Sequence, residues 1–600
     1  MRPIITALII LALVTGFIFL LPTPTEEKTT SKSGKTEASS FRLTNIHLFD
    51  GQQWIPNTQV TVINGHIANN DSQQSLPVVD GEHGYLIPGL IDAHTHTWGE
   101  ALQQALNFGV TTELDMFTDY RFLQQHKTQR DNVDQVKQAD LFSAGTLATS
   151  PKGHGTEYGI PVPTLTSPDE AEAFVQARLK EGSDYIKIVY DRTHEKSHFT
   201  SIDKATMSAL ITAAHKHNRL AVVHISNMNS ALDAVEAGAD GLVHTFADQA
   251  VSDELLTALK KQNTFVIPTL SVIASFANQQ RGQALIDDPT LSSLVTPSIK
   301  QSLLQSFSFG DHGNHTFANA LDNTRKMHQA GILLLAGTDA PNPGTAHGIS
   351  MHDEVELLVD SGLSPTEALT AATFNAANAF GLTQRGHLKP GARADMILLS
   401  ADPAKDIKHT RAIKTIWKNG YVHTIEKDKE VSEVALKNNG VVSHFPDANL
   451  QPQNGLGFSA TSDNMMKGNS TASINWVAEG CQDAGALAVK GTVGNQFPFP
   501  WAGVFFMLGE SMQKGVNLTA QKSIEFQVKG QPGQYRLMVF TRDSQRPAEV
   551  GFEVSAQCQP IQIDFAQLDA VDWGNVTGFA WVAGKQQSDF HFTLDNIVIN

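Results

Sequence analysis

Short apolar runs alternate with amphipathic segments between residues 86 and about 380. Three of the amphipathic segments have helical spacing, 168–181, 202–217 and 228–237. Eight runs have the length of buried strands: the run that ends at His94, then 110–116, 141–147, 185–190, 220–225, 241–246, 265–270 and 332–337. Eight strand and helix units over roughly 290 residues predict a (β/α)8 TIM barrel in an α/β fold, with a doubly wound open sheet as the alternative.

Beyond about Asn439 the spacing changes, because apolar and polar residues alternate with a period of two. The clearest such segments are 523–528, 534–540, 549–554, 579–582 and 590–598. This spacing is typical of antiparallel strands with one buried face, and no long helical pattern interrupts it. The C-terminal third is therefore expected to be a separate all-β sandwich.

The N-terminus has a third pattern, an uncharged apolar run of 18 residues at 4–21 that follows Arg2 and ends at Pro22. The run is long for a signal peptide and just long enough to span a bilayer, and no convincing Ala-x-Ala cleavage site follows it. Residues 1–21 are expected to be an N-terminal membrane anchor or a cleaved signal peptide. Either one predicts an exported protein, periplasmic or otherwise extracytoplasmic. Residues 22–40 are rich in Ser, Thr and Lys and are expected to be a disordered linker.

The charge and the cysteine content limit the partners and the compartment that the chain suits. The net charge is −17 and no basic block is present, which argues against nucleic-acid binding. The chain has only two cysteines, Cys481 and Cys558, both in the C-terminal third. In an oxidising compartment they can form a disulfide, and two separate buried thiols are the alternative.

The first strand of the predicted barrel ends in Asp92-Ala93-His94-Thr95-His96. Residues two apart on a strand face the same side, so His94 and His96 can bind one metal ion together. His215 and His217 have the same spacing but close a helical segment, where residues two apart diverge by about 200°. That second pair is expected to face solvent.

Four more polar residues stand at strand ends: Lys187, His224, His244 and Asp339. In a barrel the carboxyl ends of the strands meet at one mouth, so these side chains are expected to converge with His94 and His96. A hydrogen-bonded core histidine is the alternative for His224 or His244 alone. For Asp339 the alternative is the cap of the following turn, 340–343.

Lys187 lies between apolar strand residues, where an unpaired ammonium would be costly to bury. A neutral amine can instead take up CO2 and become a carbamate, an anionic ligand that can bridge two metal ions. A lysine in a salt bridge inside the barrel is the alternative.

Several motifs resemble those of the amidohydrolase superfamily, specifically its binuclear subgroup with a bridging lysine, over about residues 41–425. They are Pro88-Gly89-Leu90-Ile91-Asp92-Ala93-His94-Thr95-His96, Ile186-Lys187-Ile188, Val222-Val223-His224, Val243-His244-Thr245 and Gly337-Thr338-Asp339-Ala340, in the family's order. The resemblance implies a barrel over 86–385 and a small β-sandwich built from 41–85 plus 386–425. After this stretch we expect a linker at 426–450 and the C-terminal domain at 451–600.

The resemblance also implies roles. His94, His96 and Asp339 would hold the more buried metal and His224 and His244 the more exposed one, while carboxylated Lys187 would bridge both together with a hydroxide. Asp339 would take the proton of the hydroxide and pass it to the leaving atom. Imidazole and carboxylate ligands favour two zinc ions, although manganese, cobalt and iron suit similar ligand sets.

Loops after the strands supply three candidate substrate-binding residues, His154, Tyr190 and His347, each with an ordinary loop role as the alternative. The motifs are most similar to the dipeptidase and prolidase-like branch. Two departures weaken the transfer of a dipeptide substrate: residues 190–192 replace the usual Gly-Gly turn, and 113–115, Glu-Leu-Asp, replace the usual Val-Arg-Asp.

The end of the chain, Phe592-Thr593-Leu594-Asp595-Asn596-Ile597, resembles the complex I intermediate-associated-protein family and related galactose-binding-like modules. That resemblance implies a possible glycan partner and no catalysis. Core packing is the expected role of the aromatic residues of this part, and a sugar-stacking platform is the alternative. These residues are Phe497, Phe499, Trp501, Trp573 and Trp581.

The sequence thus predicts an exported metal-dependent hydrolase of an amide, peptide or cyclic amide bond. Its expected substrate is a small molecule such as a dipeptide, an N-acyl amino acid or a cyclic amide. Two alternatives stay open: a mononuclear, deaminase-type amidohydrolase, and a catalytically inactive tethered protein that binds glycan.

Overall fold

The structure is a computed structural model that describes residues 40–600. Within that span it leaves out 71–74, 157–161, 192–198, 308–313, 425–435, 437, 447–449, 451, 464–467, 482–484, 498, 510–514, 542–546, 569–570 and 586–587. The predicted anchor or signal segment and almost all of the predicted 22–40 linker lie outside the described residues. Among the described helices, none combines the length and the apolar content needed to cross a bilayer.

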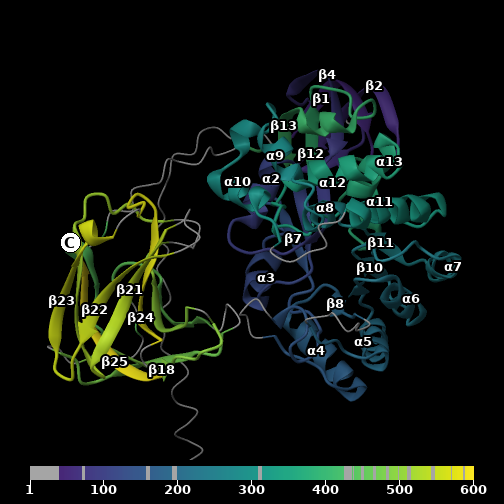
Figure 1. Cartoon of the computed structure of the whole chain (residues 1–600). Helices are drawn as coiled ribbons and strands as arrows, with labels where there is room; N and C mark the ends of the chain where they lie inside the picture. The colour runs from purple at the N-terminus through teal and green to yellow at the C-terminus, as the bar shows by residue number, and fades with distance from the viewer. Residues whose placement is uncertain are drawn as a thin grey trace, which may run out of the picture. The chain divides into compact units, whose positions relative to one another are not determined.

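Two distant segments of the chain form one seven-stranded sheet (Figure 1). Its strands, in spatial order, are β14 (Tyr421–Val422), β13 (Ile413–Lys418), β12 (Met396–Leu399), β4 (Val78–Pro88), β1 (Phe41–Phe49), β2 (Trp54–Ile63) and β3 (His66–Ala68). Apolar residues of both segments, such as Leu43 and Trp417, share one buried cluster. These segments are the ones expected to pair as a small β-sandwich. Its status as a separate domain stays a prediction.

Strand β4 leads into the strands that carry the predicted site, and these form two parallel sheets. One contains β5 (Leu90–Thr95), β6 (Val110–Asp115) and β7 (Asp140–Ser143). The other contains β8 (Ile186–Val189), β9 (Ala221–His224), β10 (Gly241–Val243) and β11 (Phe265–Ile267). Nearly every residue of these strands is buried, as expected for parallel strands covered on both faces.

The eighth predicted strand, 332–337, is not a regular strand. Leu334 makes an isolated parallel bridge with Val266 of β11, and Ala340 makes one with Thr95 of β5. Another isolated parallel bridge joins Ala148 to Ile188, between the two sheets. The backbone N–H of Leu335 donates to the carbonyl of Val266 at 3.0 Å, and that of Ala93 donates to the carbonyl of Ala336 at 2.9 Å. The segment therefore contacts β11 on one side and β5 on the other without a continuous ladder.

Helices follow most of these strands. They are α2 (Ala101–Asn107), α3 (Tyr120–Lys127), α4 (Ala171–Glu181), α5 (Lys204–Lys216), α6 (Met228–Glu236), α7 (Asp253–Gln262), α8 (Leu270–Phe276), α9 (Arg281–Ile286), α10 (Pro297–Leu304), α11 (Asn314–Gln329), α12 (Ile349–Asp360), α13 (Pro365–Thr370) and α14 (Ala376–Ala379). Side-chain caps begin several of them, because a carboxylate or amide oxygen accepts an otherwise unpaired N–H. Asp203 accepts from Thr206 at the start of α5, and Asn227 accepts from Ser230 at the start of α6. The three helices predicted from spacing match α4, α5 and α6.

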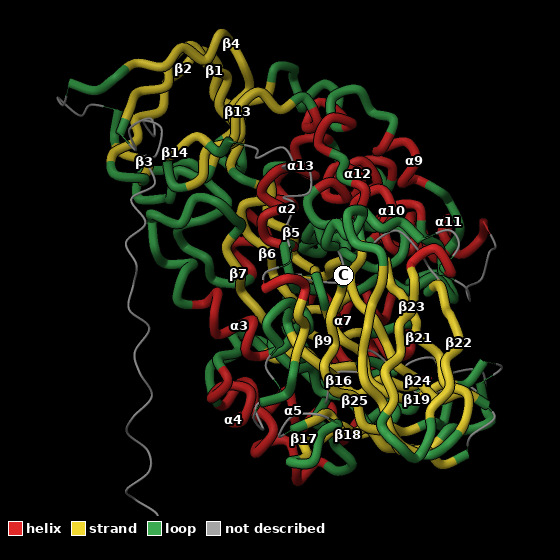
Figure 2. Tube along the Cα trace, turned by 90° about the vertical axis from the view of Figure 1, so that its left-hand side faces the viewer, coloured by secondary structure: helices red, strands yellow, loops and turns green. Residues whose placement is uncertain are grey.

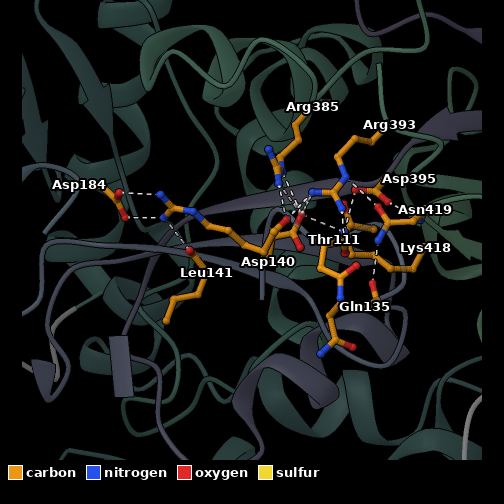
Figure 3. A network of polar contacts seen from close by, with 12 residues as sticks. Thr111, Gln135, Asp140, Leu141, Asp184, Arg385, Arg393, Asp395, Lys418 and Asn419 are labelled. Carbon is orange, nitrogen blue, oxygen red and sulfur yellow. Dashed lines mark hydrogen bonds and ion pairs between the residues drawn. The ribbon is translucent and has the colours of Figure 1, made fainter. Parts of the chain in front are cut away.

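A buried ionic network connects β7 with the seven-stranded sheet (Figure 3). Asp140 of β7 accepts from Nε of Arg385 and from Nζ of Lys418, each at 2.9 Å. Lys418 also contacts Asp395 at 2.8 Å, and Arg393 lies 3.5 Å from Asp140. Burial raises the pKa of Asp140, but Lys418 and the two arginines outweigh it and hold that pKa below its usual value.

The C-terminal part consists of antiparallel sheets, as the period-two spacing predicts (Figure 2). The six-stranded sheet contains β17 (Thr471–Val477), β18 (Ala486–Thr492), β25 (Asp589–Ile599), β20 (Ser523–Gly530), β23 (Gln559–Asp564) and β15 (Val441–Ser443), which pairs with β25. The five-stranded sheet contains β16 (Gly457–Ser462), β19 (Trp501–Met507), β24 (Val576–Gly584), β21 (Gly533–Thr541) and β22 (Ala548–Val554). Side chains of both sheets share one apolar cluster. Cys481 and Cys558 form a disulfide.

Core packing, the favoured interpretation of the candidate aromatic platform, is confirmed for Trp581. Trp581 is fully buried in the core and packs edge-on against Phe526. Trp573 stacks on Phe565 at a centroid distance of 3.8 Å. Only Phe499 is strongly exposed, at 76%. The inward face of an alternating strand holds the large side chains, which is why Trp581 belongs to the core. Glycan binding by this part stays a prediction.

Candidate metal centre

His94 lies at the carboxyl end of β5 and is completely buried, and His96 follows the strand directly. Nε2 of His94 lies 3.1 Å from Oδ1 of Asp339, and Nε2 of His96 lies 2.9 Å from the same oxygen. Gly337 allows this approach, because a Cβ at that position would lie 2.8 Å from the backbone nitrogen of His94. The structure therefore brings together the three residues assigned to the more buried metal.

His224 and His244 lie beside this group. The His244 ring centroid is 4.8 Å from that of His94 and 4.5 Å from that of His224. Nδ1 of His244 is 2.7 Å from the hydroxyl of Thr269, which orients the ring. His244, Thr269 and Asp339 all have left-handed backbones, with φ of 73°, 53° and 61°. Such conformations in residues other than glycine are unfavourable and concentrate at functional sites.

The donor atoms fit a divalent metal ion. Ligand atoms of His94, His244 and Asp339 all lie within 4.8 Å of one another. Both ring nitrogens of His94 and Oδ1 of Asp339 are buried without an aligned hydrogen bond, although the His94 and Asp339 atoms are close. Buried polar atoms rarely lack partners, and a metal ion would supply one here.

The charge states agree with this assignment. Burial, followed by the charge of Lys187, lowers the pKa of His94 well below its usual value, and burial lowers the pKa of His244 to about 3. Burial alone would raise the pKa of Asp339, but contacts with His94 and His96 hold it well below its usual value. Neutral imidazoles and an ionised carboxylate are the forms that bind metals.

Lys187 is almost fully buried in β8. Burial lowers its pKa to about 7, against the opposing charges of Asp339 and Asp115. Within the described part of the chain, the structure records no ion pair of its amine, in contrast to the salt-bridged alternative. A lysine with such a pKa is partly uncharged at neutral pH, and the uncharged amine is the form that can react with CO2. Carboxylation of Lys187 stays a prediction.

Two buried carboxylates that the sequence analysis did not single out support the ligands. Asp92 accepts from the backbone N–H groups of His94 and Thr338 and, at 2.6 Å, from the Thr338 hydroxyl. Asp115 accepts from the backbone N–H of Thr97 at 2.7 Å. Asp92 thus holds the backbone next to Asp339, and Asp115 holds the backbone just after His96. Both residues could have been found from the sequence, because an acidic residue inside an apolar strand is unusual.

The structure places the three candidate substrate-binding residues differently. The His154 ring lies 5.0 Å from the ring of His224, beside the metal ligands. The hydroxyl of Tyr190 donates to Asp233 of α6 at 2.9 Å, which favours a structural role. His347 is buried and lies 2.8 Å from Glu113, a residue that sequence reasoning noted only as a departure from the family pattern. Substrate contact by all three stays a prediction.

The surface assignment of the second histidine pair agrees with the structure. His215 contacts Asp240 at 2.8 Å, and His217 contacts Glu172 at 2.9 Å. Both are partly exposed side chains at the end of α5.

Comparison with known proteins identifies the family. The model of the amidohydrolase family matches residues 85–431, more than half of the chain. The chain belongs to the amidohydrolase family. This amidohydrolase is accordingly a hydrolase that acts on carbon–nitrogen bonds.

Relatives of this amidohydrolase share the same part of the chain. It is 22% identical to the ochratoxinase of Aspergillus niger over 407 residues, which cover 59% of this chain and 77% of that enzyme. The crystal structure of that ochratoxinase aligns with a TM-score of 0.50 and 18% identity over 64% of this chain and 96% of its own. A Xaa-Pro dipeptidase with methionine bound in its active site aligns with a TM-score of 0.52 and 20% identity over 64% of this chain and 100% of its own. At these identities the structural likeness establishes the fold alone.

Proposed function

We propose that the amidohydrolase is a binuclear metal-dependent enzyme that hydrolyses the amide bond of a small molecule, such as a dipeptide or an N-acyl amino acid. Two observations at one place carry the proposal. Possible ligand atoms of His94, His244 and Asp339 lie within 4.8 Å of one another, and both ring nitrogens of His94 and Oδ1 of Asp339 are buried without an aligned hydrogen bond. The names of its relatives, an ochratoxinase and a Xaa-Pro dipeptidase, support a small amide or peptide substrate.

The proposal includes a closed eight-stranded barrel. The isolated parallel bridges at Ala148, Leu334 and Ala340 support it, because they lie where the two sheets and the segment 332–340 approach one another. In a closed barrel all strands end at one mouth, which places the donor residues together.

His94, His96 and Asp339 would hold one metal ion, His224 and His244 would hold the second, and carboxylated Lys187 would contact both. When bound, divalent ions polarise a substrate carbonyl and lower the pKa of water. Oδ1 of Asp339 lies against the two imidazoles, so Oδ2 is the oxygen that accepts a proton from the attacking water and returns it to the leaving nitrogen.

Metal analysis tests this proposal. Purified protein is expected to carry close to two divalent ions per chain, and Lys187→Ala is expected to lose most of them. Lys216→Ala, which changes an exposed lysine of α5, is the matched control and should retain both. Undiminished metal in Lys187→Ala would contradict the bridge, and one ion per wild-type chain would favour the deaminase-type alternative.

Activity is tested with zinc-loaded and manganese-loaded protein on dipeptides, N-acyl amino acids and cyclic amides, by measuring the amine released. If no compound is turned over while the C-terminal part binds glycan, the inactive tethered protein would be the better description.

We also propose that the protein is exported. The uncharged run at 4–21 and the disulfide between Cys481 and Cys558 support this location, because disulfides persist in oxidising compartments. Fractionation of the native cells tests it, and recovery of the protein with cytoplasmic markers would contradict it.

A further inference from the structure

A carboxylate and an imidazole form a buried pair within the electrostatic reach of Asp92 and Asp115, the two carboxylates that support the candidate metal centre. Nδ1 of His347, on the segment before α12, lies 2.8 Å from Oε1 of Glu113 in β6. Their side chains are 4% and 0% exposed. The two residues are 234 positions apart in the sequence. The contact fixes one nitrogen of the ring, so that the other nitrogen, Nε2, points away from Glu113.

The pair is incomplete. Nε2 of His347 is buried and has no hydrogen-bond partner in the structure. His352, a buried histidine five positions further on, has partners at both ring nitrogens, Thr410 and the carbonyl of Phe108. A histidine with a purely structural role would be expected to resemble His352.

His347 also lines a small cavity of about 40 Å³. Other residues of its wall include Trp98, Ile299, Ser302 and Pro341. Trp98 is two positions beyond His96, and Pro341 is two positions beyond Asp339, so this cavity adjoins the metal-ligand segments. The volume suits a small group such as a carboxylate or a carbonyl rather than a whole substrate.

The charges around His347 favour a ring that donates. Burial lowers the pKa of His347, but the carboxylate of Glu113, with those of Asp92 and Asp115, raises it above its usual value. An imidazolium donates from both nitrogens. Nδ1 then donates to Glu113, and Nε2 is left to donate to an oxygen atom.

We propose that Glu113 is a positioning residue that holds His347 so that its Nε2 donates to an oxygen of the bound substrate, in the cavity next to the metal ligands. This inference rests on the proposed function.

A double-mutant cycle tests whether Glu113 acts through His347. Glu113→Val removes the carboxylate and keeps a β-branched residue suited to a strand. Glu113→Val is expected to raise KM roughly 10- to 100-fold, because a hydrogen bond to a charged group contributes about that much to binding. The kcat should stay within about threefold of wild type, and the metal content should be unchanged. Glu113→Gln, which keeps an acceptor oxygen, should recover part of the loss. In a His347→Asn background, Glu113→Val should have little further effect.

Two substrates separate the sources of the oxygen. If Nε2 donates to a free carboxylate of the substrate, Glu113→Val and His347→Asn should each lose more kcat/KM on an N-acyl amino acid than on its C-terminal amide. If it meets a carbonyl, the losses should be equal. An unchanged KM in Glu113→Val would overturn the proposal. So would an equal rise in KM when Glu113→Val is made in wild-type protein and in His347→Asn.

A readout without turnover separates this inference from the proposed function. In deuterated protein with 15N-labelled histidine, the signals of His347 are identified by their absence in His347→Asn. Wild-type Nδ1 is expected to carry a proton, and Glu113→Val is expected to shift that signal towards a mixture of tautomers. An unprotonated Nδ1 in wild-type protein would refute the positioning role even if the enzyme were active. The matched control is Glu356→Gln on α12, which breaks a partly buried ion pair with Arg411 and should leave KM unchanged.

Discussion

Two His-x-His sequences stand on different backbones in this chain. His94 is buried at the end of β5 and contacts Asp339, whereas His215 closes α5 and contacts Asp240 at the surface. On the strand both imidazoles reach the same carboxylate, and on the helix the two rings contact different acids. The difference in backbone therefore decides which pair can share a ligand.

Replacing each pair in turn should show this difference. His94→Ala is expected to lose bound metal and to lower kcat/KM more than about 100-fold, because even outer partners of metal ligands contribute 10- to 100-fold. His215→Ala has the same change in size and should keep both metal content and activity. Metal analysis and steady-state kinetics on both variants measure this, and equal losses would contradict the assignment of the centre to β5.

Single site residues were predictable where they stand at the end of a strand, because that position directs the side chain towards the ends of the neighbouring strands. His94, His96, His244 and Asp339 do lie together. The pairing of Glu113 with His347 was not predictable, because it depends on how the segment after Asp339 returns towards β6. No periodic pattern encodes that path.

At the scale of elements, apolar runs predicted the strands but not their ends. Strand β10 stops at Val243 although the apolar run continues to 246, and β11 stops at Ile267 although its run continues to 270. The left-handed backbones of His244 and Thr269 end these strands. Hydrophobic pattern reports neither backbone conformation nor the continuity of a ladder, so 332–337 resembles a regular strand although it makes only an isolated bridge at Leu334.

Helix α12 should make the stability of the protein sensitive to acid. Burial lowers the pKa of His352 to about 3, and the neutral ring has partners at both nitrogens. Its unfolded pKa is about 6.5. Below that pH the unfolded chain binds a proton that the folded chain does not, so this contribution is complete above pH 6.5 and is lost as pH falls towards 3.

Equilibrium unfolding measured between pH 7 and pH 4 tests the effect. Wild-type protein should lose up to about 1.4 kcal/mol per pH unit from this group, and His352→Gln should have a shallower dependence. Parallel curves for the two proteins would assign the acid sensitivity to other groups.

At the scale of the whole molecule, the buried ionic network should stabilise the junction of β7 with the seven-stranded sheet. Lys418→Met leaves Asp395 without its buried cation and is expected to cost about 3 to 5 kcal/mol of unfolding free energy. Lys414→Met, on the same strand β13, breaks an exposed pair with Glu82 and should cost less than about 1 kcal/mol. Denaturant titrations compare them, and a small loss in Lys418→Met would show that the network contributes little.

Spacing predicted the parallel strands of the first part and the antiparallel strands of the second, and β17 shows why some strands were missed. Six strands of the C-terminal part were not predicted: β15, β16, β17, β18, β19 and β23. In β17 no residue is fully buried, so polar and apolar positions differ little there. A strand whose two faces have similar exposure has a weak period-two signal.

The seven-stranded sheet has a consequence for synthesis on the ribosome. Strand β4 runs directly towards the ligand-bearing strand β5, but its neighbour β12 is translated about 300 residues later. Until Met396–Leu399 emerges, β4 presents an unpaired edge just before the strand that carries His94. An unpaired edge favours aggregation, so we expect this edge to need protection while the intervening units are made. We also expect the candidate metal centre to become rigid only after Asp339 and β12 have been translated.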